Sequence, residues 1–96
     1  MEAIKVYVYG AGMLYRKLMM SSSPLRKRLE ILGIVTTEDI GVDTMDGYPV
    51  IRPREIDQSK MDYVVIAAAA WKEMADCLVE IGVDASKIIR SGVFNI

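Results

Sequence analysis

The sequence predicts a single α/β domain over residues 1–96, with a mostly parallel sheet of about four to five strands. Three observations lead to this fold class. Short β-branched runs alternate with segments of helical periodicity, a glycine turn joins the first run to the first helix, and 96 residues leave room for one core. Hydrophobic residues make up 52% of the chain and charged residues 26%, which is the balance of an ordinary globular domain.

The first half of the chain predicts a strand, a helix, a short second helix and a second strand. Residues 4–9 (IKVYVY) are β-branched and aromatic, as in a buried strand. Residues 13–20 have apolar side chains on one face of a helix, and Pro24 ends that helix. Residues 25–30 are expected to hold either a short second helix or a continuation of the first beyond a kink, and residues 31–35 the second strand.

The second half continues the alternation. Residues 36–47 are polar and rich in turn formers, which predicts a loop. Residues 48–51 are expected to form a short strand at the sheet edge, because they include a proline. Residues 63–67 are the clearest buried strand, residues 71–81 the clearest amphipathic helix, and residues 87–90 a last short strand.

Strands that alternate with helices imply right-handed crossovers and a parallel sheet. The predicted fold class is therefore a small Rossmann-like three-layer domain, about half of a doubly wound nucleotide-binding fold. Ligands of such sheets bind at the carboxyl ends of the strands, where the strand order reverses. This rule places the candidate site at residues 10–12, near residue 36 and near residues 67–70.

Composition excludes several classes of function. The net charge of −1 argues against a nucleic-acid binder, and no apolar run approaches the ~18 residues of a membrane span. The first residues lack the features of a signal peptide, and the single cysteine, Cys77, cannot form an internal disulfide, so we expect a cytoplasmic protein. Because the chain has no histidine, serine- and cysteine-type triads and histidine-ligated metal sites are excluded.

The turn Gly10-Ala11-Gly12 matches the first two glycines of G-x-G-x-x-G, after a strand and at the start of a helix. Gly10 permits the tight turn, and Gly12 lets a phosphate approach the backbone. Free N–H groups at the helix start, from Met13 on, then bind the anion. Tyr15 replaces the third glycine, and we expect it to push the helix away from the sheet or to narrow the cleft.

Two further segments reach the same edge of the predicted sheet. The second strand ends in Thr36 and Thr37 instead of the acid that binds ribose hydroxyls, so Thr36 is expected to bind a hydroxyl more weakly. The loop from Thr37 to Asp39 would select the ligand. Ala67 and Ala68, after the strand at residues 63–67, are small enough to admit a flat ring or a sugar, or they simply pack closely.

Other candidate residues favour structural roles. Tyr15 and Tyr48 are the aromatic residues expected to face the cleft, whereas Trp71 begins an apolar stripe and is expected in the core or an interface. Cys77 has no histidine to activate it. The aspartates of residues 36–47 lack the spacing of a calcium loop. No catalytic residue and no metal ligand is therefore assigned.

Taken together in their order, five segments resemble the Rossmann-like domain at the front of bacterial sugar O-acyltransferases of the bacillosamine type. Similar domains accompany other nucleotide-sugar and polysaccharide-biosynthesis proteins. The segments are residues 6–12, 32–35, 46–51, 62–67 and 81–89. The resemblance implies a nucleotide or nucleotide-sugar cleft lined by Gly10, Ala11, Gly12 and Thr36. It also implies that catalysis would come from a partner or from a domain beyond residue 96, because those acyltransferases carry their catalytic base on a separate β-helix domain.

The leading hypothesis is a non-catalytic module of bacterial surface-sugar metabolism that binds a nucleotide, a nucleotide-sugar or NAD(P). The alternative is a ligand-free domain that serves oligomerisation or scaffolding. Apolar surface around Val93, Phe94 and Ile96 would favour that alternative and a homo-oligomer. A weaker alternative is a fragment of an NAD(P)-dependent enzyme.

Overall fold

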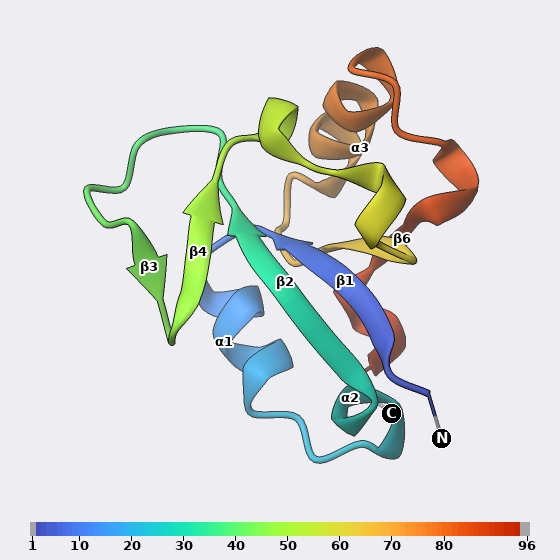
Figure 1. Ribbon diagram of the computed structural model, residues 1–96. Coiled ribbons are helices and arrows are strands. Elements are labelled where there is room, and N and C mark those ends of the chain that lie inside the picture. The colour runs from blue at the N-terminus through green and yellow to red at the C-terminus, as the bar shows by residue number, and fades with distance from the viewer. Residues whose placement is uncertain (1, 95–96) are drawn as a thin grey trace.

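A computed structural model describes residues 2–94 of the chain (Figure 1). Its centre is a six-stranded sheet with the order β3-β4-β2-β1-β5-β6. The strands are β1 (Ile4–Tyr9), β2 (Leu29–Val35), β3 (Thr44–Met45), β4 (Tyr48–Ile51), β5 (Tyr63–Ile66) and β6 (Ile88–Arg90). All neighbouring pairs are parallel except β3 with β4. The prediction of an α/β domain with a mostly parallel sheet is therefore confirmed.

Short helices connect the strands. The α-helices are α1 (Met13–Met19), α2 (Pro24–Lys27) and α3 (Trp71–Glu80), and the 3-10 turns are η1 (Pro53–Glu55), η2 (Gln58–Lys60), η3 (Ala85–Lys87) and η4 (Ser91–Phe94). The helices end within a few residues of their predicted bounds, as fraying ends usually do. The crossover from β4 to β5 contains only η1 and η2. In the described part of the chain, no helix is long and apolar enough to cross a membrane.

The strand order reverses at β1. From β1 the chain moves outward through β2 to β4, and it then crosses back to β5 and β6 on the other side of β1. The carboxyl ends of β1, β2, β4 and β5 consequently meet at one edge of the sheet, from which the glycine turn and α3 both depart.

The strand count exceeds the predicted four to five because residues 36–47 are not entirely a loop. Thr44 and Met45 form β3 and pair antiparallel with β4. Asp46 and Gly47 connect the two strands with φ values of 52° and 85°. Two successive positive φ values are typical of a two-residue type I′ hairpin, for which Asp-Gly is a favoured sequence.

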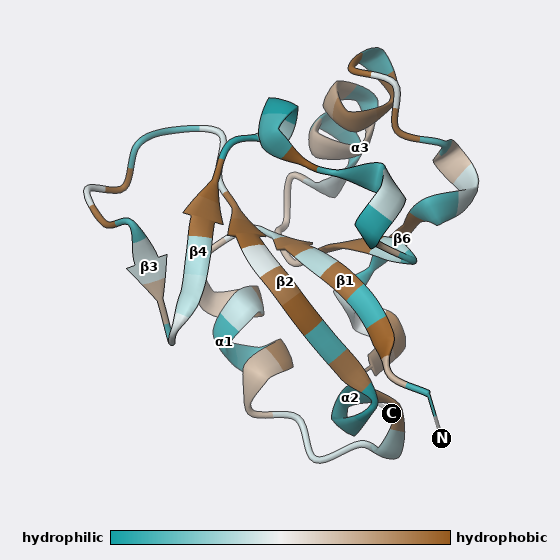
Figure 2. Ribbon diagram, in the orientation of Figure 1, coloured by the Kyte–Doolittle hydropathy of each residue, from teal (hydrophilic) through white to brown (hydrophobic). Residues whose placement is uncertain are grey.

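Alternating side chains of β1 fill two core clusters, one on each face of the sheet. Val6 and Val8 pack with Leu18 of α1 on one face, and Tyr9 packs with Leu78 of α3 on the other. Figure 2 shows the apolar residues concentrated along the sheet strands. Burying a side chain such as Leu78 contributes roughly 1.5–3 kcal/mol, so these contacts fix both helices against the sheet.

The final 3-10 turn, η4, folds back against α1. Phe94 is only 2% exposed, and its carbonyl oxygen accepts a hydrogen bond of 3.0 Å from the Ser21 hydroxyl. Val93 is 46% exposed. Phe94 therefore adds no apolar surface of the kind that would favour oligomerisation, because its side chain completes the core on the α1 face, while Ile96 lies outside the described residues.

Candidate functional site

Gly10 is held between the ends of two strands. Its N–H donates to the carbonyl of Val35 at 2.9 Å, while the N–H of Ala67 donates to the carbonyl of Tyr9 at 2.8 Å. Gly10 has a φ of 118°, and a Cβ added there would lie 2.4 Å from the carbonyl oxygen of Ala67. The fold alone therefore requires a glycine at this position.

Gly12 differs from Gly10 in its surroundings. It is the N-cap residue of α1, with a φ of −98° and a ψ of −144°. A Cβ added to Gly12 would meet nothing within 4 Å. The absence of a side chain at Gly12 thus leaves open space above the turn, whereas at Gly10 it avoids a clash with Ala67.

A hollow of about 360 Å³ lies over this turn, at the carboxyl ends of β1 and β2. It contains the following predicted site residues: Gly10, Ala11, Gly12, Thr36 and Thr37. The remaining wall comes from Tyr9, Glu38, Ile40 and Met74. Two segments that are distant in sequence therefore meet around one space.

The other predicted site residues lie elsewhere. The side chain of Met13 is 83% exposed and does not line this hollow. Ala67 is 2% exposed and belongs to the core on the α1 face, while Ala68 is half-buried against the core on the α3 face. The chain after β5 passes close to Gly10 at these two alanines, because Gly10 has no side chain.

Thr36 and Thr37 have different roles at the end of β2. Thr36 is only 6% exposed, and its hydroxyl accepts a hydrogen bond of 3.0 Å from Nη1 of Arg52. That bond joins the ends of β2 and β4, and together with the burial of Thr36 it gives the hydroxyl a structural role. Thr37 is exposed, and its Oγ1 lies 2.5 Å from the hydroxyl oxygen of Tyr9.

Tyr9 holds the Thr37 side chain through a hydrogen bond between the two hydroxyl groups. The Tyr9 side chain is 1% exposed, and burial raises the pKa of its hydroxyl. The phenol therefore keeps its proton at neutral pH, and Tyr9 and Thr37 share a neutral hydrogen bond. This bond fixes the position of the Thr37 hydroxyl at the mouth of the hollow.

The expectation that Tyr15 and Tyr48 face the cleft is wrong. Tyr15 is 2% exposed, and its hydroxyl donates to Oδ2 of Asp46 at 2.5 Å. Burial, followed by the contact with Asp46, raises the pKa of Tyr15. Tyr48 packs against the same core cluster. The third-glycine position thus accepts tyrosine because its ring fills space between α1 and the β3–β4 hairpin, not space over the turn.

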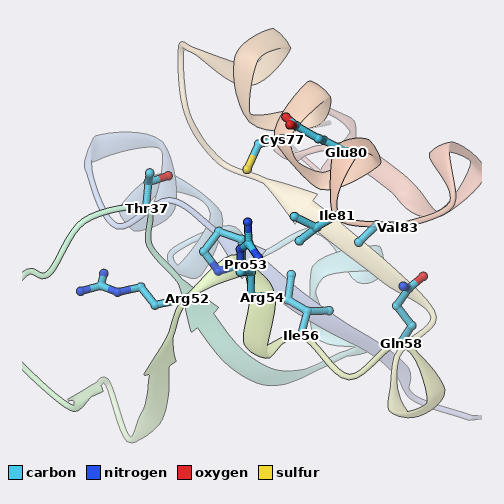
Figure 3. A pocket seen from close by; sticks show the side chains of 10 residues that line it. All are labelled: Thr37, Arg52, Pro53, Arg54, Ile56, Gln58, Cys77, Glu80, Ile81 and Val83. Carbon is cyan, nitrogen blue, oxygen red and sulfur yellow. The ribbon is translucent and has the colours of Figure 1, made fainter.

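A second, larger hollow of about 650 Å³ adjoins the first and opens between η1 and α3 (Figure 3). Thr37 lines both hollows. The other lining residues are Arg52, Pro53, Arg54, Ile56, Gln58, Cys77, Glu80, Ile81 and Val83. Sequence reasoning missed the arginines, although they directly follow β4, whose carboxyl end lies at the same edge.

Within residues 2–94, no group of three or more cysteine, aspartate or glutamate side chains is arranged to hold a metal ion. The polar groups around both hollows are hydroxyls, guanidinium groups, one amide, one thiol and scattered carboxylates. Such groups are suited to hydrogen bonding and to binding a negative charge.

The family model described as C2185-like, N-terminal, matches residues 2–89. The chain belongs to this family. The matched range includes every residue that lines the two hollows and ends before η4. A comparison with curated proteins finds no match.

Proposed function

We propose that this domain is a non-catalytic Rossmann-like module that binds a nucleotide or a nucleotide-sugar at the turn of residues 10–12. The observation that carries this proposal is the free space over Gly12, where an added Cβ would meet nothing within 4 Å. A phosphate group approaches the backbone most closely where no Cβ stands in its way. Gly12 therefore serves the ligand, whereas Gly10 serves the fold.

The surroundings support the same role. The turn lies at the carboxyl edge of the parallel strands, beside the point where the strand order reverses. The Thr37 hydroxyl, held by Tyr9, provides a polar contact for a sugar or ribose hydroxyl. We also propose a three-layer arrangement of helix, sheet and helix, which is supported by α1 and α3 packing on opposite faces of the sheet.

The wider role follows from the resemblance to the front domain of bacillosamine-type O-acyltransferases. In this role the domain holds a nucleotide-linked sugar in the cytoplasm, and a partner or a further domain modifies the sugar. The chain itself contributes binding. A surface-sugar pathway is the setting that we propose, and the ligand panel below tests its chemistry.

The test is a thermal-shift panel with UDP-sugars, CMP-sugars, NAD⁺, NADP⁺, acetyl-CoA and S-adenosylmethionine. A ligand at 100 times its dissociation constant stabilises the folded state by about 2.7 kcal/mol, which shifts the melting temperature of a small domain by several degrees. Gly12→Asp should abolish the shift, because it places a side chain and a negative charge in the phosphate position.

Gly92→Asp is the matched control. Gly92 is also exposed, has no positive φ and has nothing within 4 Å of an added Cβ, but it lies in η4. We expect this variant to keep the ligand shift. A cooperatively melting protein that shifts with no ligand of the panel would overturn the proposed function. Self-association measured by sedimentation would then favour the oligomerisation alternative.

A further inference from the structure

The larger hollow contains a positive charge that the protein does not neutralise. Within residues 2–94, the guanidinium group of Arg54 makes no hydrogen bond and no ion pair. Arg52 differs, because it donates to Thr36 and lies 4.0 Å from Oδ1 of Asp39. Figure 3 shows Arg52 extending away from the other lining residues, whereas Arg54 lies among them.

The residues that line the hollow around Arg54 do not neutralise its charge. Glu80 is the acidic residue that lines the hollow, and within residues 2–94 it forms no ion pair with Arg54. The Cys77 sulfur points from α3 toward η1. Apolar side chains of Ile56 and Ile81 complete the walls. Arg54 itself is exposed, so an anion that enters the hollow can reach its guanidinium group directly.

The position of Thr37 connects this charge to the glycine turn. Thr37 lines both hollows, so a molecule seated over residues 10–12 reaches the larger hollow by passing one side chain. The two spaces of about 360 and 650 Å³ are together large enough for a nucleotide with an attached group.

We propose that the ligand extends from the glycine turn past Thr37 into the larger hollow and carries there a second negative group that binds Arg54. This inference rests on the proposed function, because the first phosphate must sit over the glycine turn. The second group is a carboxylate or a phosphate, since a guanidinium group binds either through paired N–H donors. The ligand class is therefore a nucleotide or nucleotide-sugar with an additional anionic substituent.

The experiment is an NMR titration of the ¹⁵N-labelled chain with two matched pairs of probes. UDP-glucuronate differs from UDP-glucose by a carboxylate in place of a hydroxymethyl group, and NADP⁺ differs from NAD⁺ by a phosphate. The amides of residues 10–12 report the glycine turn, and those of residues 54–58 report the larger hollow. In at least one pair we expect the more anionic member to bind about tenfold more tightly, as one charge-assisted hydrogen bond would give, and to shift both groups of amides.

Arg54→Ala should remove that tenfold preference and leave binding of the less anionic member unchanged. The matched control is Arg28→Ala, which removes the same charge from an exposed arginine at the opposite end of β2. This variant should keep the preference. Urea unfolding of both variants should confirm that each remains folded.

The two proposals fail in different ways. Equal binding within both pairs, with shifts at residues 10–12 alone, would overturn the role of Arg54 and leave the proposed function intact. Shifts at residues 54–58 alone would overturn binding at the glycine turn, and with it the extended ligand proposed here. No response at either place would overturn both.

Discussion

The inner and outer parts of the site differ in what already contacts them. The inner part consists of Tyr9, Gly10 and Thr36. Tyr9 is hydrogen-bonded to Thr37, the Gly10 N–H to the carbonyl of Val35, and Thr36 to Arg52. The outer part consists of Gly12 and Arg54. Among residues 2–94, no atom lies within 4 Å of a Cβ added to Gly12, and no polar group pairs with the Arg54 guanidinium group. Substitutions of the inner part should therefore lower stability, and substitutions of the outer part should lower binding.

Gly10→Ala should have the largest effect on stability. The new methyl group would meet the Ala67 carbonyl oxygen at 2.4 Å, on a backbone with a φ of 118°. The clash and the strained φ together should cost roughly 3 kcal/mol. Urea unfolding would measure this loss as a lower midpoint with an unchanged slope. A loss under ~0.5 kcal/mol would mean that β5 moves away at little cost, and the contrast between Gly10 and Gly12 would disappear.

Tyr15→Phe comes next, with an expected loss of about 1 kcal/mol at neutral pH. The change removes the hydrogen bond to Asp46 but keeps the buried ring. Ligand binding at residues 10–12 should not change, because Tyr15 does not line that hollow. Reduced binding in a stably folded Tyr15→Phe protein would show that the third motif position belongs to the site after all.

Tyr15 should also make the stability of the domain fall at alkaline pH. Its pKa is raised above the ordinary 10.0, so the folded state favours the protonated phenol. The resulting stabilisation is complete below pH 10 and is lost as the pH rises from there toward the pKa of the folded state. The midpoint of urea unfolding should fall above pH 10 in the native protein and fall less steeply in Tyr15→Phe. Equal slopes for the two proteins would contradict this assignment.

The elements at residues 4–9, 63–67 and 71–81 were predicted almost to their observed ends. The first two are compact runs of β-branched and aromatic residues, and the third has one clear helical periodicity. β3 was missed because a strand of two residues has no periodicity. Its only local signal is the Asp46-Gly47 pair, which is typical of a hairpin turn.

The sequence predicted which backbone segments form the site, but not where their side chains point. The glycine pattern and the strand ends located residues 10–12 and 36–37 at one edge. Side-chain direction is a property of tertiary packing, so the sequence did not reveal that Tyr15 enters the core or that Arg52 occupies the Thr36 hydroxyl. Arg54 was missed for the same reason, since it follows an irregular strand that contains a proline.

The bond between Arg52 and Thr36 should have a smaller effect on stability. A double-mutant cycle of Arg52→Ala and Thr36→Val should give a coupling energy of about 0.5–1 kcal/mol, because the Arg52 side chain is 38% exposed. Urea unfolding of the four proteins measures this coupling. Strict additivity would show that the bond does not hold the ends of β2 and β4 together.

Gly12→Ala should have a small effect on stability, at most about 1 kcal/mol, because alanine is a poorer N-cap than glycine. A methyl group at Gly12 meets nothing within 4 Å. Nucleotide affinity should nevertheless fall, because that methyl group stands where a phosphate approaches the backbone. A large loss of stability would place Gly12 with the inner part and remove the main support for the binding site.

The position of β1 between β2 and β5 also determines when the domain can fold. β1 is synthesised before the other described strands, yet one of its two neighbours comes from much later in the chain. The Lys5 N–H donates to the Asp62 carboxylate and so joins residues 57 positions apart. Pairs so distant in sequence form slowly, because a long loop must close before they contribute stability. A nascent chain that stops before β5 presents the apolar strand β1 as an open edge, which invites pairing with other chains. The domain therefore reaches its native state only once β5 has left the ribosome.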